Sequence, residues 1–397
     1  MRHWLVGSVL ASLLVSCGGD SLPTLCSITV AHLPGNDLTL RSDARLDRVG
    51  DGFMLFASEK DRVLVEAVGA HGAPGTLAAI PVPPHSDGPW VAAAGTPAAP
   101  GTVLLVAYAA NPAGGSADLM TFTAGLDGAM TGTPVAVGKI PDKALAPVVV
   151  AAGSGRAGQH AGITWGVPGA TPVFAKILGP DGRPVVEGPD LSIGPVDDFD
   201  CLRFGPGKGD LTVSYTQSGG APPAWVVHVA EIDASGLAGP SLNMTLGKAA
   251  TGCTASAPSA GGYGFAWKEL GTQASPGQGD FFALYDETVN SYVAHLVLSN
   301  PRAVGGMAAP IVGVGTSGNR FTLLFAHTSG AEAWDVDFEG SQVARSVTYP
   351  SAHGNIGAIS TQPVGATLVA TYADYASGDP TNQTAGDRLF AELTCRP

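Results

Sequence analysis

Gly262-Tyr263-Gly264-Phe265-Ala266-Trp267 is the stretch that decides the fold, because the chain repeats it in altered form. Each copy is a short apolar run that closes on an aromatic residue. The seven closing residues are Phe56, Tyr108, Trp165, Tyr215, Trp267, Phe325 and Tyr372. Neighbouring members of this set lie 47 to 58 residues apart. The chain is therefore an array of similar units, each roughly 50 residues long.

Each unit contains four short segments that are typical of strands. In the third unit these segments are residues 147–152, 160–165, 172–178 and 191–193. Asp181-Gly182 separates the last two, and Asp-Gly supplies the positive φ angles of a tight hairpin turn. Turns of this kind recur at Asp127-Gly128, Ser235-Gly236 and Glu339-Gly340. We predict an all-β fold, a seven-bladed β-propeller of four-stranded blades.

The two ends of the array complement each other. Residues 389–393 align with the third strand of a unit, so the seventh unit ends at Pro397 without an outer strand. Residues 27–31 form a strand-like segment ahead of the first unit. We expect this N-terminal strand to pair with the last strand and close the ring, which removes two exposed sheet edges. The chain resembles seven-bladed propellers in architecture, but it lacks the motifs of their enzymatic families.

The first residues have the pattern of an export signal. Arg2 is basic, residues 4–14 are apolar, and Leu14-Val15-Ser16-Cys17 follows. The apolar run is too short to span a bilayer as a stable helix. The segment resembles a bacterial lipoprotein signal, which implies cleavage before Cys17 and acylation of that cysteine, palmitate included. An ordinary signal with a chance cysteine is the alternative.

This pattern sets the expected domains and location. Residues 1–16 are the signal peptide, 17–25 a lipidated tether and 26–397 the propeller. We expect an exported protein, held by lipid alone on the bacterial cell envelope, at the outer membrane or cell surface rather than the cytoplasmic membrane. The formal charge of −13 disfavours nucleic acid and anionic membrane surfaces as partners.

The remaining four cysteines allow three pairings in an oxidising compartment. Cys26 opens the closing strand and Cys395 ends its expected partner, so a disulfide there would staple the ring. Cys201 and Cys253 each lie 14 residues before the closing aromatic of their unit, at equivalent positions in adjacent blades. A second disulfide between them is possible, and two buried free thiols are the alternative.

The catalytic motifs tested are either missing or explained by the repeat. Residues 153–158 match G-x-G-x-x-G, but a strand follows where a dinucleotide site needs a helix, so we interpret the match as a hairpin turn. The chain has no G-x-S-x-G, H-E-x-x-H or G-x-x-x-x-G-K sequence. No catalytic residue is assigned. The aromatic ring of seven is interpreted as core packing between blades.

Asp197, Asp198 and Asp200 form the most conspicuous polar cluster. They lie in the connection between the third and fourth blades, and their carboxylates could bind Ca²⁺. A solvated acidic loop, or a strand start capped by aspartate, is the alternative. No other cofactor is indicated.

The connections around that cluster define a candidate ligand-binding face. It includes the longest irregular segments, at residues 111–118, 269–280 and 373–387, and the equivalent connections place His85, Trp90 and His353 at its rim. Residues 373–387 are predicted to be a flexible polar loop, and Ca²⁺ is conceivable there too.

Long loops on a rigid scaffold usually carry binding. The sequence therefore favours a protein- or glycan-binding module or scaffold of the cell envelope. The alternative is a hydrolase or lyase acting on carbohydrate or lactone, with a site on the same face that could depend on Ca²⁺. A purely structural surface protein is a third possibility.

Overall fold

The structure, a computed structural model of the chain, is described here for the parts whose placement is defined. These are residues 26–41, 44–49, 52–59, 61–82, 91–95, 104–110, 117–140, 149–154, 161–166, 173–185, 191–194, 203–206, 211–219, 224–232, 242–246, 250–251, 255–258, 262–270, 279–286, 291–297, 314–317, 320–327, 330–337, 342–349, 351–353, 355–364, 367–377 and 384–395. Among these residues, no helix is long and apolar enough to cross a membrane.

Within the described residues the strands form seven antiparallel sheets. In chain order the first three consist of β2 (Arg45–Val49), β3 (Gly52–Ser58), β4 (Arg62–Val68) and β5 (Pro74–Pro81); of β6 (Val91–Gly95), β7 (Leu104–Ala110), β8 (Ala117–Ala124) and β9 (Val135–Ile140); and of β10 (Val149–Ser154), β11 (Ala161–Gly166), β12 (Val173–Leu178) and β13 (Leu191–Gly194). The fourth consists of β14 (Arg203–Pro206), β15 (Leu211–Gly219), β16 (Ala224–Ile232) and β17 (Leu242–Leu246).

The fifth sheet contains β18 (Ala250–Thr251), β19 (Ala255–Pro258), β20 (Gly262–Leu270), β21 (Gly279–Asp286) and β22 (Ser291–Val297), with β18 and β19 both paired to β20. The sixth contains β23 (Val314–Ser317), β24 (Arg320–His327), β25 (Gly330–Asp337) and β26 (Gln342–Tyr349). The last contains β27 (Ile356–Val364), β28 (Thr367–Tyr375), β29 (Gly386–Cys395) and β1 (Cys26–Leu33).

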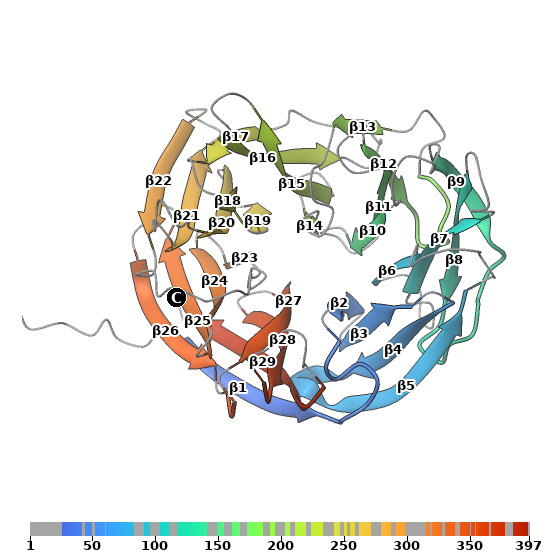
Figure 1. Cartoon of the computed structure of the whole chain (residues 1–397), viewed down its shortest axis with the longest axis horizontal. Helices are drawn as coiled ribbons and strands as arrows, with labels where there is room; N and C mark the ends of the chain where they lie inside the picture. Colours follow the sequence, from blue (N-terminus) through green and yellow to red (C-terminus); the bar gives the residue numbers. More distant parts are fainter. Residues whose placement is uncertain are drawn as a thin grey trace, which may run out of the picture.

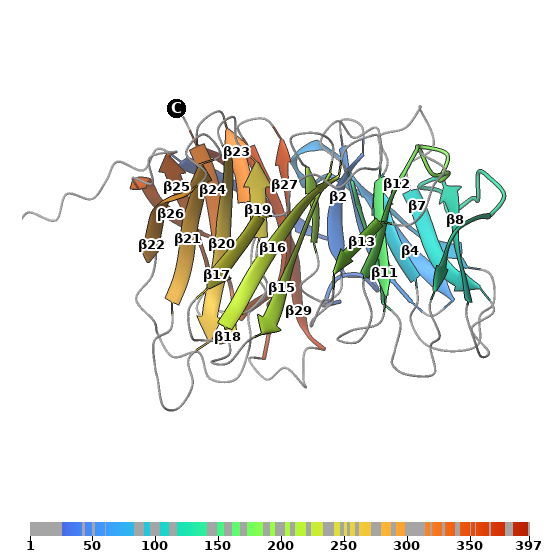
Figure 2. The ribbon, with the colours of Figure 1, turned by 90° about the horizontal axis from the view of Figure 1, so that it is seen from above.

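The sheets stand side by side around a common centre, with the first strand of each nearest the centre and the last on the rim (Figure 1). This is an all-β protein with the arrangement of a β-propeller. Viewed from the side, the strands run between two faces of the molecule (Figure 2). Because the strands alternate in direction, connections from second to third strands share one face with those from each outer strand to the next inner strand.

The repeated aromatic residue marks the second strand of every sheet, β3, β7, β11, β15, β20, β24 and β28. Phe56, Trp165 and Tyr372 are exposed by 3%, 0% and 0%, so core packing is confirmed for these three. The strands expected in the third unit are present within two residues of their predicted bounds. The glycine-rich segment after Ser154 joins β10 to its antiparallel partner β11, as a hairpin requires.

The predicted N-terminal strand pairs with β29. Eight residue pairs run in unbroken register from Cys26 opposite Cys395 to Leu33 opposite Arg388. β1 thus supplies the fourth strand of the last sheet, and Figure 1 shows it in blue beside the red strand β29. The strand is longer than residues 27–31, because its pairing with β29 runs from Cys26 to Leu33.

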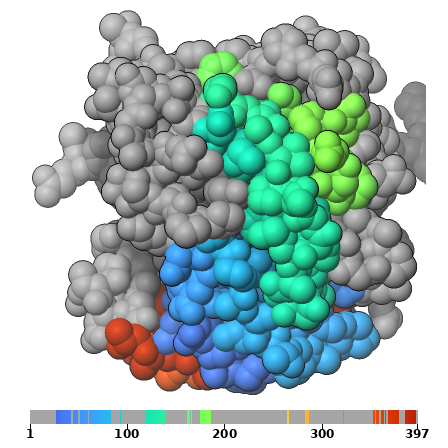
Figure 3. Space-filling model, turned by 90° about the vertical axis from the view of Figure 1, so that its right-hand side faces the viewer, coloured from blue at the N-terminus to red at the C-terminus, as the bar shows by residue number. Residues whose placement is uncertain are grey.

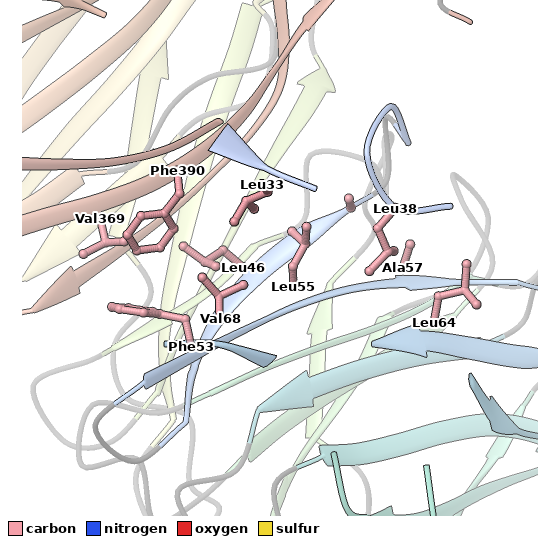
Figure 4. Packing of buried hydrophobic residues seen from close by; sticks show 11 residues of the cluster. Leu33, Leu38, Leu46, Phe53, Leu55, Ala57, Leu64, Val68, Val369 and Phe390 are labelled. Carbon is pink, nitrogen blue, oxygen red and sulfur yellow. The ribbon is translucent and has the colours of Figure 1, made fainter. Parts of the chain in front are cut away.

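An apolar cluster fills the contact between this last sheet and the first, β2–β5; we call that contact the seam. Leu33 from β1, Leu55 from β3 and Phe390 from β29 belong to the cluster (Figure 4). The rings of Phe390 and Phe53 meet edge to face with centroids 5.6 Å apart. Burying aromatic and branched side chains from both sheets is the main favourable term in such a contact.

Tight turns between third and fourth strands contact the preceding sheet. The turn from Gly69 to Ala73, which contains the 3-10 segment η1 (Ala70–Gly72), has the same two backbone hydrogen bonds as residues 125–129 and 179–183. A Cβ on Gly72 would lie 2.8 Å from Phe390, and one on Gly128 would lie 3.0 Å from the carbonyl oxygen of Ala79. Figure 3 shows the first sheet, in blue, directly beside β8 and β9, in teal.

Candidate functional site

The face opposite these tight turns carries the longer connections; we call it the loop-rich face. Its described parts near the seam are residues 34–41, between β1 and β2, and residues 351–353 and 355, between β26 and β27. Both connections are held by charged side chains of the last sheet. They form the part of the candidate site that the structure describes.

Asp374, at the end of β28, holds the connection from β26. Asp374 is fully buried, and each of its carboxylate oxygens accepts two hydrogen bonds. Oδ1 accepts from Ser351 Oγ at 2.7 Å and from the Asn355 amide at 3.4 Å. Oδ2 accepts from the amides of Ala352 at 2.6 Å and His353 at 3.0 Å. One carboxylate therefore holds four residues of this connection, 351–353 and 355.

The ionised form of Asp374 is stabilised by these donors. Burial by itself raises the pKa of the carboxyl, but the hydrogen bonds from Ser351 and from the three amides outweigh burial and leave the pKa below its ordinary value. The charge also acts on Tyr372, whose phenol pKa is raised by burial and by the nearby Asp374 carboxylate. At neutral pH the anchor is a full negative charge.

Asn355 and Tyr375 complete this anchor. The Asn355 Nδ2 donates to the carbonyls of His353 at 3.2 Å and Tyr375 at 3.1 Å, and the Tyr375 amide donates back to the Asn355 carbonyl at 3.0 Å. The close pairing of β28 with β29 requires glycine at 386, where φ is +146° and a Cβ would lie 2.2 Å from the Asp374 carbonyl oxygen. The backbone around Asp374 is thus held both by Asn355 and by the pairing of β28 with β29.

Arg388, on β29, holds the connection from β1. The residue is fully buried, and its guanidinium donates to the carbonyls of Thr39 at 2.9 Å, Arg41 at 2.8 Å and Leu38 at 3.4 Å. A buried guanidinium is tolerated only with such acceptors. The Tyr375 hydroxyl donates to the next carbonyl, that of Leu40, at 3.4 Å.

The same connection is tied to the first sheet. Asn36 Nδ2 donates to Glu66 Oε2 at 2.8 Å. Arg41 pairs with Glu59 at 2.9 Å and donates to the Ser58 carbonyl at 3.0 Å, while Glu59 also pairs with the half-exposed Arg62. The connection therefore bridges the seam on the loop-rich face.

His353 is the predicted face residue that the structure describes. It is exposed, and its own amide and carbonyl are fixed by Asp374 and Asn355. Its side chain is therefore exposed on a backbone that is held in place. The ligand it would contact stays a prediction.

The other predicted site residues lie outside the described residues. These are Cys17, His85, Trp90, Asp197, Asp198, Asp200, Cys201 and Cys253. Cys26 and Cys395 are described as backbone only, where they are directly opposite each other. Within the described chain, no group of three histidine, cysteine or acidic residues could hold a metal ion.

The prediction of a flexible polar loop over residues 373–387 was wrong at both of its ends. β28 continues to Tyr375 and β29 begins at Gly386, with Asp374 opposite Asp387. Asp374 is not available as a Ca²⁺ ligand in this arrangement, because both of its oxygens are occupied by donors from the protein. The sequence pattern did not reveal which residues of the segment would be buried.

Three further residues were not singled out from the sequence, namely Glu66, Arg388 and His71. Glu66 and Arg388 are buried charged residues inside strands that otherwise read as ordinary alternation, and no local signal distinguishes them. The turn at His71-Gly72 did leave a signal. Residues 69–73 share the Gly-x-x-Gly spacing of residues 125–129 and 179–183, although histidine replaces aspartate.

Neither a protein-family model nor a curated protein matches the chain. Among solved structures, it is similar to hydrazine synthase of Kuenenia stuttgartiensis, at 13% identity and a TM-score of 0.49, over 85% of this chain and 94% of that one. The WD40 domain of coronin from Toxoplasma gondii matches at 12% identity and a TM-score of 0.48, over 95% and 89%. An α-L-arabinanase of Penicillium chrysogenum matches at 13% and 0.45, over 94% and 97%. Similarity at this level concerns the propeller fold alone.

Proposed function

We propose that the protein is a lipid-anchored, extracytoplasmic propeller whose loop-rich face binds a protein or a glycan of the cell envelope. Cys17 is the acylated residue, and the mature chain begins there. The seven sheets are seven blades, and β1 closes the ring. The sequence supports the anchor through Leu14 to Cys17, and the pairing of β1 with β29 supports closure.

The observation that carries the binding role is the anchor at Asp374. It holds exposed residues of a connection, Ala352 and His353, in one backbone course through four hydrogen bonds. A connection fixed before binding loses little conformational freedom when a partner arrives. The described turns of the other face pack against neighbouring sheets, which leaves the loop-rich face as the better candidate for contact with a partner.

A disulfide between Cys26 and Cys395 belongs to the same proposal. Directly opposed residues of an antiparallel pair have Cβ atoms about 4.5–5.5 Å apart, and a disulfide needs about 3.5–4.5 Å. A small adjustment at the strand ends suffices. The bond would join the closing strand to its partner at the end nearest the lipid tether.

Site-specific photo-crosslinking on intact cells tests the binding role. One variant carries the crosslinker at His353 on the loop-rich face, and a matched variant carries it at Asp181, an exposed residue of a tight turn on the other face. We expect a discrete envelope partner captured from position 353 and not from 181. Equal capture at both positions, or none, would contradict binding at this face.

Two further measurements separate the components of the proposal. If the protein turns over a small carbohydrate or lactone and His353→Ala abolishes this activity, the hydrolase or lyase alternative is supported instead of binding. Mass analysis of the mature N-terminus, with Cys17→Ala as control, tests the anchor. An unacylated N-terminus at another residue would remove the anchor while leaving the binding face untouched.

A further inference from the structure

The seam contains a turn that differs from the two equivalent turns in the described part of the chain. In the turns at residues 125–129 and 179–183, the side chain of Asp127 or Asp181 accepts a hydrogen bond at 3.0 Å from the amide two residues later. His71 occupies that position in the first sheet, at φ +61°, and reaches the neighbouring sheet instead. Its Nδ1 lies 2.7 Å from Glu392 Oε2 on β29. The seam thus has an ionisable link where the other two turns are closed locally.

A second ionisable group lies inside the seam. Glu66 is only 1% exposed, on the strand β4 whose residues Leu64 and Val68 belong to the seam cluster. Its Oε2 accepts from Asn36, while Oε1 has no hydrogen-bond partner among the described residues. A buried carboxylate with one hydrogen-bonded oxygen and one unbonded oxygen is poorly stabilised. Such a site therefore favours the neutral carboxyl more than water does.

We propose that closure of the seam takes up protons at Glu66 and His71, so that β1 and β29 are held most tightly in mildly acidic surroundings. Both groups join the last sheet, or the connection leaving it, to the first sheet. The proposal concerns the seam only and does not depend on any ligand of the loop-rich face.

The charges around the two groups agree with this assignment. Among the described residues, the titratable or charged groups on the strands and the connection of the last sheet at the seam are His32 on β1, Asp37 and Arg41 on the connection, Tyr372, Asp374 and Tyr375 on β28, and Asp387, Arg388 and Glu392 on β29. Of these, Glu392 is bonded to His71, Arg388 is directed to backbone carbonyls of the connection, and Asp374 is directed to the connection on the other side of its sheet.

The two groups change stability in the same direction. Burial raises the pKa of Glu66, and its bond from Asn36 only partly opposes this. The hydrogen bond and the charge of Glu392 raise the pKa of His71. A group whose pKa is higher in the closed seam gives its full stabilisation below its ordinary value, about 4.5 for Glu66 and 6.5 for His71. That stabilisation is lost as the pH rises through the higher value.

Hydrogen exchange at the amides of β1 and β29 tests the proposal. The full-length protein is measured in detergent with a reductant from pH 5 to 8, with each rate corrected for intrinsic exchange. We expect protection of these amides to fall with pH, by at most about tenfold per pH unit for each proton released. The amides of β11 and β12, away from the seam, serve as the internal reference.

Three variants identify the groups. Glu66→Gln keeps an acceptor for Asn36 and cannot ionise, so protection at pH 8 should rise. His71→Asn tolerates the positive φ and removes the link, so protection should fall at pH 5 and stay unchanged at pH 8. Asp127→Asn, the matched change in the equivalent turn, should alter neither.

The outcomes are distinct. Protection that is independent of pH in the wild type, or an unchanged pH slope in the Glu66→Gln, His71→Asn double variant, would overturn the proposal. Absence of protection in β1 at every pH would instead contradict ring closure itself, which belongs to the proposed function.

Discussion

Replacing Asp374 by alanine removes the acceptor of four hydrogen bonds and leaves their donors behind. Bonds to a charged group contribute about 1.5–3 kcal/mol each. Here one of the four is long, at 3.4 Å, and three of the donors belong to the partly exposed residues Ser351, Ala352 and His353, where water can replace the carboxylate. We therefore expect Asp374→Ala to lower the free energy of unfolding by about 2–4 kcal/mol, less than the plain sum.

The assay is denaturant unfolding at several pH values. Because the pKa of Asp374 is lowered in the folded protein, its stabilisation is complete at neutral pH and is lost as the pH falls below about 3.8. The wild type should lose this contribution in acid, and Asp374→Ala should show no such loss. Asp374→Asn, which keeps one acceptor oxygen, should lie between the two.

A change below about 0.5 kcal/mol at neutral pH, with an unaltered acid profile, would refute the anchor. So would unchanged hydrogen exchange at the amides of Ala352 and His353. Either result would also remove the main support for a preformed binding face.

Two other substitutions test the packing around the sheets. Arg388→Met leaves the carbonyls of the 38–41 segment without their donor and should cost about 2–4 kcal/mol in denaturant unfolding, whereas Arg183→Met, at an exposed position, should cost less than about 0.5 kcal/mol. Equal costs would contradict the buried role. Gly138→Ala places a Cβ 2.6 Å from the buried ring of Trp165 and should lower the unfolding midpoint, with a cost of about 1–3 kcal/mol. A Cβ at Gly35 would meet no atom of the described residues within 4 Å, so Gly35→Ala should be neutral by comparison.

The fold followed from the sequence because its signals are local and repeated. A closing aromatic on the second strand of each sheet fixes the unit, and the strand-like segment at residues 27–31 predicted the strand that pairs with β29. Both signals are residue patterns contained within a single strand or hairpin. The positions of such elements can be read within a few residues.

The candidate site depends on contacts that are distant in sequence. Arg388 donates to Thr39, 349 residues away, and Glu66 accepts from Asn36 of the same connection, 30 residues away. Whether a charged residue on a strand faces solvent or a neighbouring backbone is decided by the arrangement of the sheets, which no local pattern contains. The place of His353 in a connection between two sheets could be predicted from the repeat, whereas its role in binding stays a prediction.

The last sheet uses opposite charges for its two neighbours. Asp374, whose side chain accepts, meets the amides of the connection arriving from β26, whereas Arg388, whose side chain only donates, meets the carbonyls of the connection leaving β1. Ala373 is opposite Arg388, so Asp374 and Arg388 lie one step apart along the sheet and face opposite sides. A connection whose backbone amides face the sheet needs a hydrogen-bond acceptor there. A connection whose carbonyls face the sheet needs a donor. Exchanging the two side chains would therefore disrupt both connections, even though the net charge of the sheet would not change.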